Sequence, residues 1–182
     1  VIGMRRRHNV IEALQVVDQL SGDSFDVRAK CFVNASGPWI ESVGRLADRD
    51  ALPIKLSPTK GVHLVVPRIN QEHGIYFQSK HDQRMIFLLP WGEHSLLGTT
   101  DTSYAESPDK VRTDAEDVRY LLEQLQQLAP SSNVAPDDVI SSFAGIRALI
   151  RSDSRKPSKR SREEQITFTN GNLISVAGGK YR

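Results

Sequence analysis

The chain has 182 residues, 38% of them hydrophobic, and a formal net charge of +2, so it is long enough for one or two domains with a buried core. Its mean hydropathy of −0.39 is typical of a soluble protein, and no apolar run approaches the roughly 18 residues of a membrane span. Such a mild charge gives no reason to expect a nucleic-acid partner. The single Cys31 excludes an internal disulfide and fits a reducing compartment.

The first part of the chain predicts a β-hairpin. Residues 9–18 are rich in Val, Ile and Leu, and residues 24–34 alternate, with Val27, Cys31 and Val33 on one face. A Ser-Gly-Asp sequence at 21–23 lies between the two runs and supplies a turn. Cys31 is therefore expected in an apolar strand.

The second run continues into Ala35-Ser36-Gly37-Pro38-Trp39. Pro38 is followed by apolar residues at helical spacing, and proline is tolerated at the first position of a helix. This pattern predicts a tight strand-to-helix turn, where a backbone of small residues can be approached by a large cofactor.

Residues 62–66 predict a strand that follows Gly61 and ends at Pro67. His63 alternates there with apolar neighbours, and it is either a satisfied structural histidine or a site residue. The hydroxyl-rich segment 98–102 is interpreted as a turn stabilised by its own side chains. Further strands are predicted over 75–78, 85–90, 95–99, 139–143, 166–169 and 173–176, the last two joined by an Asn-Gly-Asn turn.

The clearest helix is predicted over residues 113–129. Thr113 is expected to cap it, with Glu116 completing a capping box. Leucines at helical spacing form one buried stripe, and Pro130 ends the helix. We interpret this element as scaffold without chemistry.

A basic run at residues 151–162 contains four Arg, two Lys and one Asp, a local charge of +5. Arginine, lysine and serine together can hold a phosphate, although such a run is also typical of a solvated loop. Apolar, glycine-containing segments at 140–149 and 173–179 bracket it and favour a site. Without an anion, we expect the repelling cations to leave the run mobile. Just before it, Arg147 comes off a small-residue strand end.

Seven short motifs follow one another along nearly the whole chain, and together they resemble the FAD-dependent glycerol-3-phosphate dehydrogenases. The motifs are residues 33–39 (VNASGPW), 60–67 (KGVHLVVP), 89–91 (LPW), 98–101 (GTTD), 144–147 (AGIR), 161–163 (SRE) and 177–180 (AGGK). The chain departs from the family where Lys180 is followed directly by Tyr181-Arg182, without the usual Leu-Thr-Thr. It contains no Gly-x-Gly-x-x-Gly and no Cys/His metal spacing.

The resemblance implies the activity and the partners. Family members oxidise sn-glycerol 3-phosphate to dihydroxyacetone phosphate, reduce FAD and pass the electrons to quinone. The implied location is cytoplasmic, peripheral on the inner face of the cell membrane, and a homodimer is an open expectation. The alternatives are an oxidoreductase of the same fold acting on another hydroxy or amino acid, or a phosphate-binding module without a redox role.

The resemblance also implies roles for single residues. His63, Arg147 and Lys180 are the candidate catalytic residues. The substrate-binding set adds two more cations, Lys60 and Arg162. The expected FAD contacts are Ala35, Ser36, Gly37, Trp39, Gly178 and Gly179.

The expected fold is α+β, a mixed and mainly antiparallel sheet with flanking helices, from the substrate domain of a glutathione-reductase-like flavoprotein. Residues 1–50 are expected to be a remnant of the FAD-binding domain, 51–172 the substrate-binding domain, and 173–182 a strand returning to the FAD-binding domain. Because the chain opens with Val1 and ends abruptly after Arg182, we expect it to be an internal fragment that is inactive alone.

Overall fold

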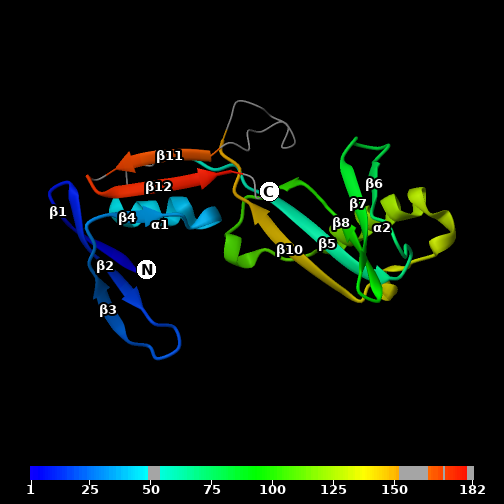
Figure 1. Ribbon diagram of the computed structural model, residues 1–182, viewed down its shortest axis with the longest axis horizontal. Coiled ribbons are helices and arrows are strands. Elements are labelled where there is room, and N and C mark those ends of the chain that lie inside the picture. Colours follow the sequence, from blue (N-terminus) through cyan, green and yellow to red (C-terminus); the bar gives the residue numbers. More distant parts are fainter. Residues whose placement is uncertain (49–53, 152–163, 170, 180–182) are drawn as a thin grey trace. The chain divides into compact units, whose positions relative to one another are not determined.

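The computed structural model describes residues 1–48, 54–151, 164–169 and 171–179. The chain divides into two compact units (Figure 1): Val1–Pro58 with Ala148–Arg182 form unit 1, and Thr59–Arg147 form unit 2. Both contain mainly antiparallel sheets and few helices, so the predicted α+β class is confirmed. The unit boundaries differ from the expected segments, because the strand after the basic run belongs to unit 1. The functional names given to the segments stay predictions.

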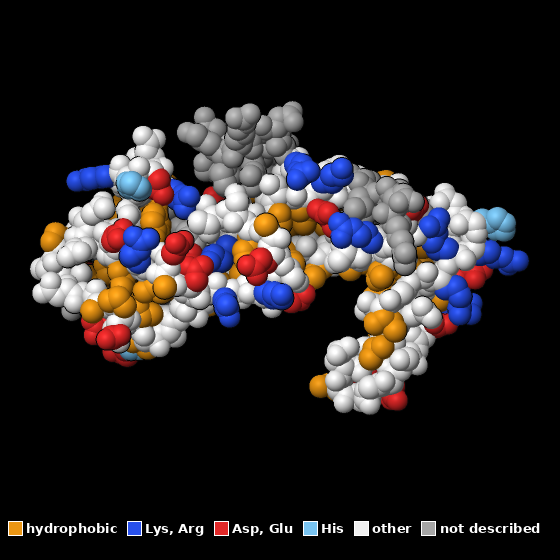
Figure 2. Space-filling model, turned by 180° about the vertical axis from the view of Figure 1, so that it is seen from behind, with side chains coloured by type: hydrophobic (Ala, Val, Ile, Leu, Met, Phe, Trp, Pro, Cys, Tyr) orange, Lys and Arg blue, Asp and Glu red, His pale blue; other side chains and the backbone are white. Residues whose placement is uncertain are grey.

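A three-stranded antiparallel sheet opens unit 1, in the order β1 (Gly3–Arg7), β2 (Val10–Val17), β3 (Ser24–Val27). The predicted hairpin is confirmed as β2 and β3. Its exposed residues include Leu20 and Phe25, and apolar side chains are visible along this arm at the lower right of Figure 2. Strand β1 escaped prediction because its sequence, GMRRR, shows no alternation.

The expected second hairpin strand is interrupted, and its predicted apolar face is wrong. Strand β3 ends at Val27, and β4 (Phe32–Asn34) belongs to a different sheet. Cys31 is exposed and outside any strand. Val33 is 63% exposed, whereas Phe32 is buried against Ile11, Ala47 and Leu173. Burial stabilises the fold more through the larger ring of Phe32 than through the side chain of Val33. Only one of two neighbouring residues in a strand can face the core.

The second sheet of unit 1 has the order β11 (Glu164–Thr169), β12 (Leu173–Gly178), β4. Strands β11 and β12 form the predicted antiparallel hairpin, whereas β12 runs parallel to β4. After β4 the chain forms the predicted strand-to-helix turn, a 3-10 turn at Gly37–Trp39 followed by α1 (Ile40–Ala47). Ile40 and Ala177 pack together in a small core that joins the helix to β12.

Unit 2 is built on a sheet of antiparallel strands in the order β10 (Ser141–Arg147), β5 (Thr59–Pro67), β8 (His94–Gly98), β7 (Met85–Trp91), β6 (Ile75–Gln78). The short β9 (Thr102–Ser103) pairs with the beginning of β5. Helix α2 (Ala115–Leu128) covers one face, where the core includes Val62, Leu64, Val66, Ile86, Leu88, Leu97, Leu121 and Leu125. Three 3-10 turns occupy Pro108–Lys110, Pro130–Ser132 and Pro136–Asp138.

The cap of α2 lies one residue later than predicted. Asp114, not Thr113, is the N-cap, and it forms a reciprocal capping box with Asp117 rather than Glu116. A carboxylate accepts the hydrogen bond of an N-terminal N–H group more strongly than a hydroxyl does. The aspartate pair also faces a buried cation, Lys60. The predicted buried stripe is confirmed at Leu121, Leu122 and Leu125.

Strand β10 also differs from its prediction, since it begins at Ser141 and runs on to Arg147. Its length is set by pairing with β5 from Val65 to Thr59. The basic run from residue 152 onward lies outside the described residues. Its expected mobility therefore stays a prediction. Within the described ranges, none of the helices combines the length and apolar character needed to cross a bilayer.

Candidate functional site

A row of residues crosses the sheet of unit 2 on the face opposite α2. The strand register pairs Phe143 with His63, His63 with Gly98, Gly98 with Phe87, and Phe87 with Tyr76. Directly paired residues of an antiparallel sheet share a face, and neighbours along a strand alternate. Val62 and Leu64 point into the core under α2, so His63 points to the other side. We call this other side the open face.

The imidazole of His63 lies over the backbone of Gly98. A methyl group added to Gly98 would stand 2.7 Å from Nε2 and 2.8 Å from Cγ of the histidine. On its other side the imidazole stacks on Phe143, with ring centroids 5.0 Å apart and planes at 13°. Burial, together with the charge of Arg147, lowers the pKa of His63 below its ordinary value of 6.5. The ring is therefore neutral at neutral pH and can accept a proton.

The guanidinium of Arg147 lies over a second glycine, Gly61. A methyl group at Gly61 would stand 2.6 Å from its Cζ atom. Nη1 donates to the carbonyl of Thr100 at 3.1 Å and lies 3.4 Å from Oδ1 of Asp101, and Nη2 donates to Oγ1 of Thr99 at 3.0 Å. With 30% of the side chain exposed, the cation is fixed in geometry yet remains accessible to an anion.

The segment that holds Arg147 is itself fixed by Thr100. This residue is 2% exposed, and its Oγ1 accepts a hydrogen bond from the Val62 amide at 3.0 Å. The interpretation of residues 98–102 as a turn omitted this role. The three consecutive polar residues Thr99, Thr100 and Asp101 hold the arginine fork in one orientation.

Lys60 does not join His63 and Arg147. It lies one residue from Gly61 and on the α2 side of the sheet, where Nζ is 2.5 Å from carboxylate oxygens of both Asp114 and Asp117. Burial lowers the pKa of Lys60, but the hydrogen bonds and charges of the two aspartates outweigh burial and raise it overall. The lysine ties the beginning of α2 to β5, and its expected part in substrate binding stays a prediction.

In unit 1, the expected cofactor contacts follow the carboxyl ends of the two parallel strands. Residues 35–39 follow β4, and Gly178 and Gly179 stand at the end of β12. Ligands of open sheets commonly bind beyond the carboxyl ends of parallel strands. Gly37, Gly178 and Gly179 all have positive φ angles, and a side chain on Gly37 would meet no atom within 4 Å. These small residues with open backbone fit the approach of a flat ring system.

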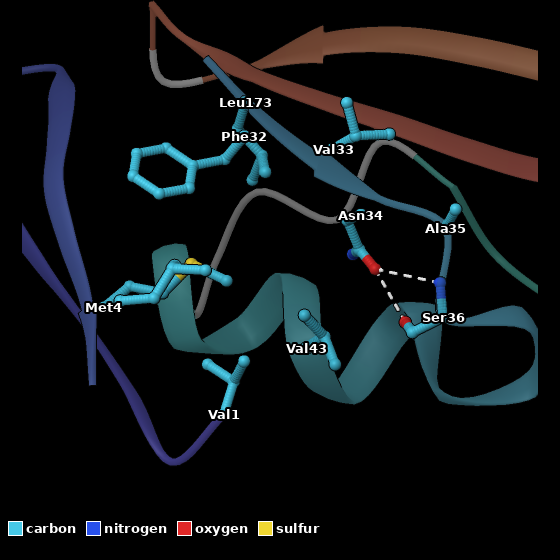
Figure 3. Close-up of a pocket in the computed structure, with 10 residues that line it drawn as sticks. Val1, Met4, Phe32, Val33, Asn34, Ala35, Ser36, Val43 and Leu173 are labelled. Carbon is cyan, nitrogen blue, oxygen red and sulfur yellow. Dashed lines mark hydrogen bonds between the residues drawn. The ribbon is translucent and has the colours of Figure 1, made fainter. Parts of the chain in front are cut away.

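Asn34 organises the turn after β4. It is 4% exposed, donates to the carbonyl of Ile40 at 3.0 Å, and accepts from Oγ of Ser36 at 2.6 Å. Figure 3 shows this contact at the edge of an apolar pocket of about 320 Å³. Asn34 was not among the expected contacts, although its place in the VNASGPW motif was a signal for it. The pocket is otherwise lined by apolar side chains, including Met4, Phe32, Val43 and Leu173.

The described residues therefore place the expected site residues in two groups. His63 and Arg147 share the open face of unit 2, and Ala35, Ser36, Gly37 and Trp39 belong with Gly178 and Gly179 to unit 1. Arg162 and Lys180 lie outside the described residues. Within these ranges, no cluster of His, Cys, Asp and Glu could hold a metal ion.

Comparison with known proteins shows the family of the chain. Residues 1–180 match the family model described as FAD dependent oxidoreductase. The chain is 37% identical over 172 residues to the aerobic glycerol-3-phosphate dehydrogenase of Staphylococcus saprophyticus, covering 93% of this chain and 31% of that protein. The chain therefore belongs to the FAD-dependent oxidoreductase family, and it spans about a third of the length of such relatives.

Solved structures show the same fold. The glycerol-3-phosphate dehydrogenase from Bacillus halodurans complexed with FAD is similar with a TM-score of 0.85 and 35% identity, over 99% of this chain and 34% of that one. The L-proline dehydrogenase from P. horikoshii reaches a TM-score of 0.65 at 14% identity, over 98% of this chain and 43% of that one. At that identity the likeness concerns the fold alone.

Proposed function

We propose that this chain is the substrate-domain portion of an FAD-dependent dehydrogenase that oxidises sn-glycerol 3-phosphate to dihydroxyacetone phosphate. The observation that carries the proposal is the pairing of a neutral histidine with a fixed arginine on the open face, each lying over a glycine. A dianionic substrate with a reacting hydroxyl needs both a cation of fixed geometry and a proton acceptor. The dehydrogenases among the relatives support the choice of substrate.

In the proposed reaction, His63 accepts the proton of the C2 hydroxyl as the alcohol becomes a ketone. Its lowered pKa keeps the imidazole in the accepting form at neutral pH. Arg147 binds a phosphate oxygen or the developing alkoxide with two N–H groups on one plane, and its hydrogen bonds to Thr99 and Thr100 hold that plane in place. Burial and the same positive charge both disfavour protonation of the base before substrate arrives.

FAD, when bound, would take the hydride that leaves C2. The segments at residues 35–39 and 178–179 are the ones that would hold the flavin, because their glycines at positive φ leave open backbone that a flat ring system can approach. We further propose that the electrons pass to quinone and that the protein works as a peripheral protein at the inner face of the cell membrane. The cations Arg162 and Lys180 are proposed to complete the substrate site.

Anaerobic mixing of the full-length protein with substrate tests the function. Loss of oxidised flavin absorbance on addition of sn-glycerol 3-phosphate, but not of glycerol, is the expected result, because glycerol lacks the phosphate. Reduction by L-proline or another amino acid instead would favour the alternative activity on the same fold. A protein that shows no flavin spectrum would favour the phosphate-binding module.

A pair of matched variants connects the result to the site. His63→Gln should slow flavin reduction by about a hundredfold or more, which is the usual contribution of a general base. Arg119 offers the control, because it is an exposed arginine on α2, the helix that covers the opposite face of the sheet. Arg119→Gln should leave the reduction rate unchanged. Equal rates for both variants and the unaltered protein would remove His63 from the mechanism.

A further inference from the structure

We infer that Phe143 and Gly98 are positioning residues, which together form a slot that holds the imidazole of His63 in one orientation. The inference rests on the proposed function of His63 as the proton acceptor. Neither residue touches the reacting atoms in this account. Each acts through the ring that lies between them.

Gly98 provides the space for the ring. It is the direct partner of His63 in the β5–β8 register, on the same face of the sheet. Any side chain at this position would begin 2.7 Å from Nε2, well inside ordinary van der Waals contact. The histidine can therefore lie across the neighbouring strand only because residue 98 lacks a Cβ atom. An alanine would force the ring to another rotamer, away from strand β8.

Phe143 closes the other side. It is the direct partner of His63 in the β10–β5 register, and its ring stacks on the imidazole with a 13° angle between planes. It remains 49% exposed, on the face opposite the α2 core, so stability alone gives little reason for a large apolar ring there. A flat neighbour restricts rotation of the imidazole about its terminal torsion, which is otherwise broad.

The slot determines where the ring nitrogens point, and that direction matters for proton transfer. A misplacement of about 1 Å at a reacting group can cost a hundredfold in rate. The slot also shields the ring from water, which contributes to the lowered pKa of His63. Among the described residues, the charged group that acts on the ring is Arg147, from the same strand as Phe143. Removal of the aromatic ring should leave that charge in place and restore part of the hydration.

The chain offers a conservative variant and a matched control. Phe143→Tyr keeps the flat ring, whereas Phe143→Leu keeps only the apolar bulk. Tyr76 belongs to the same row, is 57% exposed, and packs against Phe87, with the ring planes tilted by 33°, rather than against the histidine. Tyr76→Leu therefore removes an aromatic ring of similar exposure from the open face without touching the slot.

Two measurements on the full-length protein test the inference. In the first, steady-state oxidation of glycerol 3-phosphate with an artificial electron acceptor gives kcat and KM. Phe143→Leu should lower kcat about tenfold with little change in KM, Phe143→Tyr should restore most of the rate, and Tyr76→Leu should have no effect. In the second, NMR of labelled histidine follows the titration of the His63 ring. Phe143→Leu should raise its pKa, and Tyr76→Leu should leave it unchanged.

The two measurements separate the possible failures. If the unaltered protein is not reduced by glycerol 3-phosphate, the proposed function fails, and the titration still decides whether the slot holds the ring. If Phe143→Leu leaves both the His63 titration and kcat unchanged, the inference is wrong. Gly98→Ala is a further variant, and it should lose kcat to a similar extent as Phe143→Leu. Should that variant not fold, the Phe143 variants decide alone.

Discussion

The position of the Arg147 guanidinium over Gly61 predicts that the substitution Gly61→Ala lowers kcat/KM. The new methyl group would stand 2.6 Å from the guanidinium carbon, whereas contacts of 3.4 Å and more are ordinary. The guanidinium must therefore move by about 0.8 Å, and its hydrogen bonds to Thr99 and Thr100, at 3.0 and 3.1 Å, cannot all survive that shift. Because rate is sensitive to displacements of this size, kcat/KM should fall about tenfold to a hundredfold.

The cross-strand partner of Gly61 supplies the control. Gly145 lies directly opposite on β10 and on the same face, but a methyl group there would meet no atom within 4 Å. Gly145→Ala should therefore leave kcat/KM nearly unchanged, and neither glycine has a positive φ that would strain an alanine. The assay is steady-state oxidation of glycerol 3-phosphate by the full-length protein with an artificial electron acceptor, with thermal unfolding measured alongside. Equal kcat/KM for the two folded variants would show that the position of the Arg147 guanidinium over Gly61 does not matter for the reaction.

Further predictions concern the charged groups of unit 2. Arg147→Lys should lower kcat/KM about tenfold to a hundredfold, because a charge-assisted hydrogen bond is worth roughly 1.5–3 kcal/mol, and the loss should persist at high salt, whereas Arg119→Lys should change little at either ionic strength. Arg147→Met should raise the pKa of His63, measured by NMR titration, because it removes one of the two causes that lower it. Since the folded protein resists protonation of His63, stability should fall as pH drops below about 6.5. His63→Gln should weaken that dependence of the unfolding free energy on pH, measured by urea unfolding at several pH values. An unchanged dependence would show that His63 is not its cause. Lys60→Met should lower the free energy of unfolding by about 3 kcal/mol or more, since it leaves the buried Asp117 without its cation; a loss below 1 kcal/mol would show that the pair is not buried as described.

Local sequence patterns predicted much of the fold. Alternation and turn residues located the central strands, because one face of each must be buried, and β6 was predicted with its observed bounds. Helix α2 was located from its leucine stripe, although its cap was misplaced by one residue. The failure at residues 28–34 has a tertiary cause. Phe32 has its packing partners in α1 and β12, and no local pattern reveals them.

The candidate site was predictable to a smaller extent. The resemblance identified His63 and Arg147, but what brings them together is the register between β5 and β10, which a single sequence does not specify. The same limit explains why Lys60 was grouped with them, since its aspartate partners lie more than fifty positions away in the chain. Gly61 and Gly98 carried a signal that could have been used, because glycine inside a strand often marks close approach by another group.

The pH dependence of anaerobic flavin reduction at saturating glycerol 3-phosphate tests whether neutral His63 is the proton acceptor. If neutral His63 accepts the C2 proton, the rate should be constant at neutral pH and decline on the acid side, with an apparent pKa below the ordinary 6.5 of histidine. His63→Gln should be slower by about a hundredfold or more and should lose that acid limb. A His63→Gln variant with the rate and pH profile of the unaltered protein would show that His63 is not the proton acceptor.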